Sequence, residues 1–154
     1  MAGFHNLIGK VWRRFPARLR RWSMRLLHTR FTVTAGALIF NHDGQILLLK
    51  HRFRAGSGWG LPGGFLEAGE QPIDALRREL REELNLEVED VEIFRARSFR
   101  KPKQVEILFR GRADGSISPR TIEVERAEWF SIDALPQGLP RDQRTLVEQA
   151  AKSV

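Results

Sequence analysis

The hydrophobic period of the chain changes at residue 31, and this change constrains the fold more than any other feature of the sequence. In residues 1–30, apolar side chains recur every three or four positions, as on one face of a helix, and arginines fill the other face. Pro16 interrupts this pattern and predicts two helices with a kink. From Phe31 onward, β-branched and apolar runs between turn residues predict strands. We therefore expect a basic amphipathic helical arm, residues 1–30, and a separate domain, residues 31–154.

The charges follow the same boundary. Residues 1–30 contain eight lysines or arginines and no acidic residue, whereas the basic residues of the domain nearly balance its 19 acidic ones. A length of 154 residues suits one domain with an appendage. The absence of cysteine excludes disulfides, cysteine-ligated zinc and thiol catalysis. Apolar runs of at most four residues exclude a transmembrane helix, which needs about 20.

The domain sequence predicts a mixed sheet between helices. The expected elements are strands at 31–40 and 45–50, a short strand at 59–61, a glycine-rich loop at 62–70, a helix from Pro72 to Leu84, strands at 88–98 and 104–113, a strand ending near Trp129, a short helix capped by Ser131 and a terminal helix opened by Pro140. Because strands and helices alternate without regular βαβ spacing, we expect an α/β (α+β) fold.

The predicted helix after the glycine-rich loop combines an apolar stripe with a patch of carboxylates. Glu79, Glu82 and Glu83 have i, i+3, i+4 spacing and therefore lie on one side of the helix. By itself, such a triplet is more often a solvated acidic face. Here two glycines precede it, which lets backbone approach a ligand, and Mg²⁺ binds carboxylates together with substrate phosphates. An ion pair between Glu70 and Arg78 would hold the loop on the helix and support a metal site.

The same spacing resembles the Nudix box. That motif has nine defined positions, which fall here on Gly64, Glu70, Arg78, Glu79, Leu80, Glu82, Glu83, Asn85 and Leu86. Eight agree, and the exception is Asn85, where the family has glycine. Asparagine is the usual substitute at a helix end that needs a positive φ. The flanking hairpin, the Trp59-Gly-Leu-Pro-Gly-Gly run and Trp129-Phe130 are also similar to the family. The resemblance covers about residues 31–150 and implies a Nudix-like α/β/α sandwich.

The resemblance implies hydrolysis of a nucleoside diphosphate linked to another moiety, such as a nucleotide sugar, ADP-ribose or a nucleoside triphosphate. The implied cofactor is Mg²⁺ (or Mn²⁺). By position, the residues that would bind the metal or act in catalysis are the carbonyls of Gly63 or Gly64, the carboxylates of Glu79, Glu82 and Glu83, and the further acid Glu123. The family does not fix which acid is the general base, and an exposed strand glutamate is an equal alternative for Glu123.

Two basic loops are candidates for substrate binding, because loops on a rigid sheet often carry function. The candidate residues are His51, Arg52, Arg54, Trp59, Arg100 and Lys103. For any single cation, a solvated loop charge is at least as common. Trp59 could stack a base, but packing beside the sheet is the stronger alternative.

The arm leaves three alternatives open. Its apolar stripe could pack on its own domain or on a second subunit, which would give a homodimer. It could lie on an anionic membrane surface, because Trp, Phe and Leu stand opposite arginines. It could also be a targeting segment, because it is rich in arginine and free of acids. We expect a cytoplasmic protein that acts on a small nucleotide, with membrane association under the second alternative.

Two other functions compete with hydrolysis of a small nucleotide. One is a Nudix module that binds a nucleotide or RNA without cutting it, and the other is a pyrophosphohydrolase for RNA 5′ ends. The basic arm permits RNA binding, but nothing in residues 31–154 requires it, so nucleic acid is not the expected partner. The complete set of box carboxylates argues against a pure binder, because clustered acids repel each other.

Overall fold

We describe residues 16, 18 and 29–152 in a computed structural model of the chain. The chain divides into two compact units, residues 1–31 and 32–154, and the second unit is described below by itself. The predictions for the arm, namely its two helices, the kink at Pro16 and its docking or targeting role, lie outside the described residues. Within the described residues, no helix is long and apolar enough to cross a membrane.

The domain consists of seven strands and two α-helices in the part of the chain that the structure describes. In chain order they are β1 (Thr32–Phe40), β2 (Ile46–His51), β3 (Trp59–Gly60), β4 (Gly63–Phe65), α3 (Pro72–Leu84), β5 (Glu89–Phe99), β6 (Gln104–Arg112), β7 (Val124–Phe130), the short 3₁₀ helix η1 (Ile132–Ala134) and α4 (Arg141–Ala151). Nearly all of these elements begin and end within a residue or two of the prediction.

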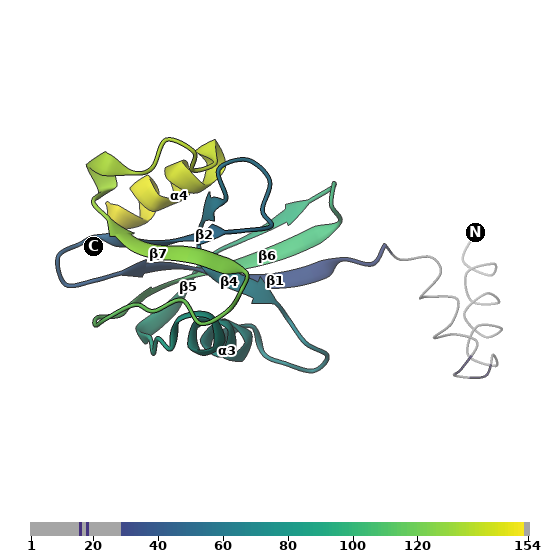
Figure 1. Cartoon of the computed structure of the whole chain (residues 1–154). Helices are drawn as coiled ribbons and strands as arrows, with labels where there is room; N and C mark the ends of the chain where they lie inside the picture. Colours follow the sequence, from purple (N-terminus) through teal and green to yellow (C-terminus); the bar gives the residue numbers. More distant parts are fainter. Residues whose placement is uncertain (1–15, 17, 19–28, 153–154) are drawn as a thin grey trace. The chain divides into compact units, whose positions relative to one another are not determined.

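The strands form one mixed sheet, as predicted. The order β3-β2-β1-β6-β5 places β1 and β6 at the centre as a parallel pair, and the other pairs are antiparallel. In addition, β7 pairs with β2 and β4 pairs with β1. Helices α3 and α4 cover opposite faces of this sheet (Figure 1). The α/β fold with a sheet between helices is therefore confirmed.

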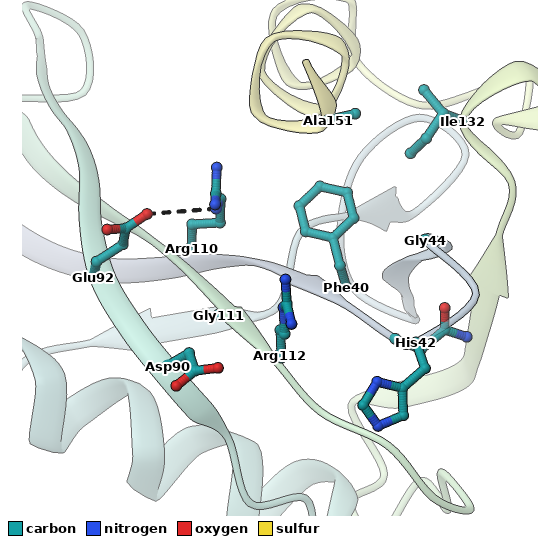
Figure 2. A pocket seen from close by; sticks show the side chains of 11 residues that line it. Phe40, His42, Gly44, Asp90, Glu92, Arg110, Gly111, Arg112, Ile132 and Ala151 are labelled. Atoms are coloured by element: carbon teal, nitrogen blue, oxygen red, sulfur yellow. Dashed lines mark ion pairs between the residues drawn. The ribbon is translucent and has the colours of Figure 1, made fainter. Parts of the chain in front are cut away.

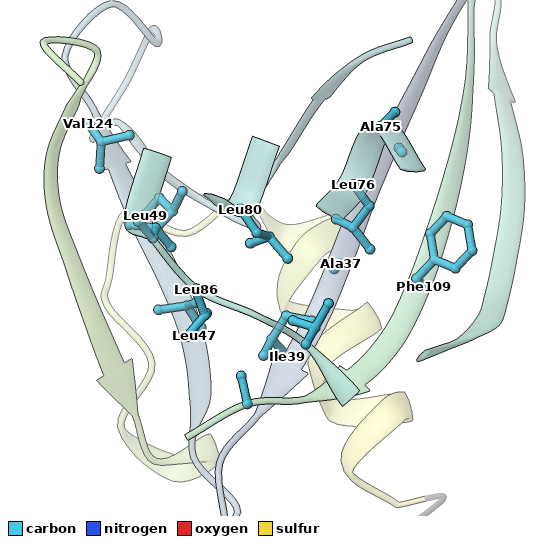
Figure 3. Packing of buried hydrophobic residues seen from close by; sticks show 14 residues of the cluster. Ala37, Ile39, Leu47, Leu49, Ala75, Leu76, Leu80, Leu86, Phe109 and Val124 are labelled. Carbon is cyan, nitrogen blue, oxygen red and sulfur yellow. The ribbon is translucent and has the colours of Figure 1, made fainter. Parts of the chain in front are cut away.

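Strand β1 is buried on both faces because a helix covers each side of the sheet. Alternate residues of a strand point to opposite faces. Ala37 and Ile39 pack in the cluster that contains Leu76 and Leu80 of α3 (Figure 3). Leu38 packs in a second cluster, with Leu146 and Val147 of α4. The apolar stripe predicted for α3 is thus its core-facing side.

Helix α3 begins and ends where its sequence predicts. Pro72 stands in the first turn, where its missing N–H costs no hydrogen bond. Asn85 adopts the left-handed conformation with φ 54°, and its N–H bonds back to the carbonyl of Arg81. The N–H of Leu86 then bonds to the carbonyl of Leu80, which closes the helix end. Asparagine therefore replaces the glycine of the motif without loss of the cap.

Two local predictions were wrong. The glycine-rich segment was expected to be a loop throughout, but Gly63–Phe65 forms strand β4, which pairs with β1 through Gly36↔Gly63 and Ala35↔Gly64. Glycine has a low strand propensity, so the sequence of this segment gives little indication of a strand. Its hydrogen-bonding partner, β1, is supplied only by the tertiary structure. Ser131 precedes η1, yet its side chain makes no capping hydrogen bond.

Candidate active site

The loop between β4 and α3 is held against the helix by one arginine. Arg78 donates to Glu70 through Nε (2.9 Å) and Nη2 (3.1 Å), and Nη2 also donates to the carbonyl of Phe65 (3.1 Å). Glu70 in turn accepts the backbone N–H of Glu67 (2.9 Å). The bonds from Arg78, and after them the bond from Glu67, hold the pKa of Glu70 below its usual value. The expected Glu70–Arg78 ion pair is therefore present, and it joins both ends of the loop to α3.

Glu79 lies directly against the glycine pair of β4. Its Oε1 accepts a hydrogen bond from Arg78 Nη1 (3.0 Å). A Cβ atom placed on Gly64 would overlap the Glu79 carboxylate. Gly64 therefore leaves the space that this carboxylate occupies, which brings backbone of β4 and a helix carboxylate together.

Glu83 is a buried carboxylate among other acids. It is only 7% exposed, and its Oε2 has no hydrogen-bond partner among the described residues. Burial is the main cause that raises its pKa to about 7, and the charges of Glu79 and Glu123 add to the effect while Arg54 opposes it. Buried polar atoms are normally paired, and a strongly perturbed acid beside a cleft marks a candidate functional site.

The three box glutamates occupy different environments. Whereas Glu83 is buried, the side chain of Glu82 is 59% exposed and reaches Arg78 Nη1 at 3.4 Å. Arg78 also pairs with Glu79, so one guanidinium serves two of the three carboxylates. Among the described residues, no group of three His, Cys, Asp or Glu side chains is assembled as a metal cage. The structure therefore brings the three carboxylates to one side of α3, but it does not converge them on one point.

The donor set nevertheless fits a hard divalent cation. Glu79 lies against the β4 backbone at Gly64, and Glu83, on the same side of α3, has a buried oxygen without a partner among the described residues. Oxygen ligands of this kind suit Mg²⁺ or Mn²⁺. Glu123 precedes β7 and is exposed, and its carbonyl accepts the N–H of Arg52 (2.8 Å). Its charge contributes to the raised pKa of Glu83, which places it near the same group of acids.

A cleft of about 170 Å³ is lined by Gly64, against which Glu79 lies. It is lined by residues from the starts of β1 and β6, from the loop between β2 and β3, from the segment after β3 through β4, and from the first turn of α4, namely Thr34, Ala35, Gly36, Arg54, Leu61, Pro62, Gly63, Gly64, Phe65, Gln104, Glu106 and Gln143. The cleft therefore extends from Gly63 and Gly64 of β4 to the start of α4.

Of the cations predicted to bind substrate, only Arg54 lines this cleft. Its guanidinium occupies the space that a side chain on Gly60 would fill. Burial lowers the pKa of Arg54, whereas the charges of Glu83 and then Glu106 raise it. Arg54 therefore lies between the acidic group on α3 and the carboxylate on β6.

The other predicted substrate residues lie outside the cleft. Trp59 packs edge-to-face on Phe130, with ring centroids 5.0 Å apart, which is the structural alternative. Arg52, Arg100 and Lys103 are exposed on loops. His51 is half-buried, and its pKa is lowered to about 4 by burial and then by Arg54.

The sequence interpretation missed three polar residues that line the cleft, Gln104, Glu106 and Gln143. Gln104 and Glu106 alternate with apolar residues at the start of the strand, so a polar face was visible in the sequence. For Gln143 no sequence signal exists, because a polar residue in the first turn of a terminal helix is ordinary. Its place in the cleft depends on the packing of α4 against the sheet.

Comparison with known proteins assigns the fold to one class. The family model of the NUDIX domain matches residues 30–150. The crystal structure of a MutT NUDIX hydrolase from Burkholderia pseudomallei superposes with a TM-score of 0.70 at 30% identity, covering 79% of this chain and 98% of that one. The chain belongs to the NUDIX domain family.

Curated relatives give finer likenesses. The chain is 30% identical over 115 residues to an NAD-capped RNA hydrolase NudC from Vibrio parahaemolyticus, covering 73% of this chain and 44% of the relative. It is 32% identical over 127 residues to an RNA pyrophosphohydrolase from Halorhodospira halophila, covering 79% of this chain and 61% of the relative. The chain thus spans less than two thirds of the length of either protein. Both names refer to RNA, so the expectation that nucleic acid is not a partner finds no support in them.

Proposed function

We propose that this protein hydrolyses the pyrophosphate bond of a nucleoside diphosphate linked to another moiety, with Mg²⁺ or Mn²⁺ as cofactor. The observation that carries the proposal is the buried Oε2 of Glu83, which has no partner among the described residues although the charges of Glu79 and Glu123 act on this carboxylate. A structural role would have paired or exposed this oxygen. Coordination of a cation offsets the free-energy cost of burying this carboxylate and the repulsion between the acids.

Each part of the site has a distinct task in this proposal. Glu79, Glu82 and Glu83, with a carbonyl of Gly63 or Gly64, would hold the metal. When bound, the metal neutralises charge on the phosphate oxygens and lowers the pKa of a water molecule. Arg78, fixed by its ion pairs, holds the carboxylates and the β4 backbone in constant positions relative to each other.

The remaining residues bind the substrate or accept the proton of the attacking water. Arg54 lies in the cleft and offers a guanidinium to a phosphate oxygen. The water that attacks phosphorus loses its proton to one of the acids in this group, which comprises the three box glutamates and Glu123. The glycine pair of β4 lets the substrate approach the backbone closely.

A substrate panel tests the proposal directly. The panel contains nucleoside triphosphates, ADP-ribose, nucleoside diphosphate sugars, dinucleoside polyphosphates and NADH, each with Mg²⁺ and with Mn²⁺. We expect metal-dependent release of a nucleoside monophosphate or of pyrophosphate from at least one of them, and no release with EDTA. Binding without cleavage across the whole panel would favour the non-catalytic module instead.

The names of the relatives favour one second candidate, hydrolysis at the 5′ end of RNA. The same diphosphate chemistry would then act on a nucleotide that is attached to a polynucleotide. A short RNA with a 5′ triphosphate or an NAD cap, compared with the free nucleotide at equal concentration, separates the two candidates. A higher kcat/KM for the RNA would assign the RNA end as the substrate.

A further inference from the structure

The end of the sheet that contains the cleft also exposes most of the large apolar side chains on the domain surface. Within the described part of the domain, these exposed side chains are Phe53 (74%), Phe65 (61%), Ile93 (68%) and Ile122 (72%). Phe53 follows β2, Phe65 ends β4 and Ile122 precedes β7. Of the four, Ile93 alone lies elsewhere, in the middle of β5.

Strand pairing places Phe53, Phe65 and Ile122 at one end of the sheet. Strands β1 and β6 are parallel and both begin at this end (Figure 1). Because β2 and β4 run antiparallel to β1, both finish where β1 begins. The last residue of β2 pairs with the first residue of β7. Phe53 and Ile122 each lie two residues beyond this pair, on segments that are joined by a hydrogen bond from the N–H of Arg52 to the carbonyl of Glu123 (2.8 Å).

Cations accompany these apolar side chains. The two loops at this end, residues 52–58 and 100–103, contain no acid, and their charged residues are Arg52, Arg54, Arg100, Lys101 and Lys103. The acids nearest to the three apolar residues along the chain are Glu67 and Glu123. At the opposite end of the sheet, residues 87–92 contain only acids, which Arg110 and Arg112 offset in part: Glu87, Glu89, Asp90 and Glu92. The cleft end is therefore the positive end of the domain.

Exposed apolar side chains with neighbouring cations indicate a surface that binds a partner. Proteins bind single-stranded RNA in basic grooves where bases stack on aromatic rings, but isoleucine cannot stack, and Phe53 and Ile122 are almost three-quarters exposed. At a membrane surface, apolar side chains enter the boundary between headgroups and acyl chains while cations attract anionic lipids. The sequence of residues 1–30 has the same combination of Trp, Phe and Leu with arginine.

We propose that the cleft end of the domain binds the surface of an anionic membrane. Phe53 and Ile122 enter the headgroup region, and the cations of residues 52–58 and 100–103 contact the lipid phosphates. The cleft, which Arg54 and Phe65 line, then faces the membrane. The proposal does not rest on the proposed function, because it assigns a binding surface and no reaction.

A fluorescent label at a single position tests this orientation on the full chain. The chain contains no cysteine, so Phe53→Cys, Ile122→Cys and Ile93→Cys each accept the environment-sensitive fluorophore NBD at one site. With vesicles of equimolar phosphatidylglycerol and phosphatidylcholine, emission from positions 53 and 122 should shift to shorter wavelength, because the label leaves water. Position 93 is the matched control, being similarly exposed but distant from this end, and its emission should stay as in buffer. Vesicles of phosphatidylcholine alone should give no shift, because the anionic charge is missing.

Vesicle flotation of the unlabelled full chain gives a second measurement. The double variant Phe53→Ser/Ile122→Ser should lower the partition coefficient about 10-fold, because two apolar side chains no longer leave water. Ile93→Ser should leave the partition coefficient within about twofold of the wild type, since its side chain stays in water. Circular dichroism checks that both variants are folded.

Three results would overturn the proposal. The first is unchanged emission at positions 53 and 122 with anionic vesicles, or an equal shift at position 93. The second is a shift with a single-stranded RNA oligonucleotide and none with vesicles, which would assign the surface to RNA. The third is a shift that appears without vesicles as the protein concentration rises, which would assign it to a second copy of the chain.

Discussion

Two cavities lie on the α4 face of the sheet, at opposite ends of β1, and the larger one is not the candidate active site. The larger, of about 540 Å³, is lined by the end of β1 at Phe40, by Arg110 and Arg112 on β6, and by Ala151 at the end of α4 (Figure 2). The smaller, of about 170 Å³, lies under the start of the same helix. Volume alone would have selected the other end of the sheet.

The difference between the cavities lies in the state of their charged groups. At the larger cavity, half-buried Arg110 pairs with the exposed Glu92 (3.5 Å), and His42 pairs with Asp114 (2.9 Å), where both side chains are exposed. Ion pairs that are open to solvent in this way contribute little free energy. The smaller one is lined by Arg54, whose charge acts on Glu83, a buried carboxylate of α3 with an oxygen that has no partner among the described residues. Chemistry is expected where charge is buried and uncompensated, because only there is a ligand needed to complete the site.

The largest expected effect concerns Glu83. Glu83→Gln should reduce turnover roughly 10³-fold, because it removes a carboxylate from the proposed metal site. The fold should survive, since the amide has the same shape and needs no desolvation of charge. The control is Glu92→Gln at the larger cavity, which should leave turnover within twofold. Near-normal turnover of Glu83→Gln, with substrate and Mg²⁺ saturating, would remove the metal-site assignment.

The next prediction concerns the ion pair that holds the loop before α3 in place. Glu70→Gln weakens the ion pair with Arg78 and should reduce turnover or Mn²⁺ affinity by roughly 10- to 100-fold. Manganese titration followed by electron paramagnetic resonance measures the affinity separately from kcat. Glu125→Gln breaks the ion pair with Lys50 (3.1 Å) away from the cleft and should change neither quantity. Equal behaviour of the two variants would show that the loop needs no such support.

A smaller effect concerns His51, the last residue of β2. The loop that follows it brings Arg54 to the smaller cavity. The pKa of His51 is about 4 in the folded protein and about 6.5 when unfolded, so the unfolded state binds the proton more readily. Its contribution to stability is therefore complete above pH 6.5 and is lost as the pH falls from 6.5 to 4. Because the side chain is only half-buried, we expect a loss on the order of 1 kcal/mol. Urea unfolding at pH 7 and pH 5 measures it, and His51→Gln should flatten this part of the profile.

The smallest expected effect concerns a residue that lines the larger cavity. Arg112→Gln alters the larger cavity without touching the acidic group on α3, so kcat and KM should both stay within twofold of the wild type. A steady-state assay on the best substrate of the panel is sufficient. A loss beyond about 10-fold would mean that the larger cavity takes part in the reaction after all.

The sequence predicted the helix of the site almost completely. Pro72 and Asn85 mark the ends of α3, and the spacing of Glu70 and Arg78 anticipates their ion pair. It did not predict which cation reaches the cleft, because several arginines and lysines stand in similar loops. Arg54 differs from Arg52 only in where the loop turns, and Gly60 provides the space for its guanidinium.

Local spacing by itself determined the family of this protein, the acidic side of α3 and the cap at Asn85, because helix periodicity and φ preferences depend on near neighbours. The tertiary structure decided which of those carboxylates is buried and what faces it. Gln143 meets Leu61 across 82 residues, and Glu106 reaches the cleft through the register of β6 beside β1. Contacts of this kind follow from the packing of whole elements, and no short stretch of sequence contains them.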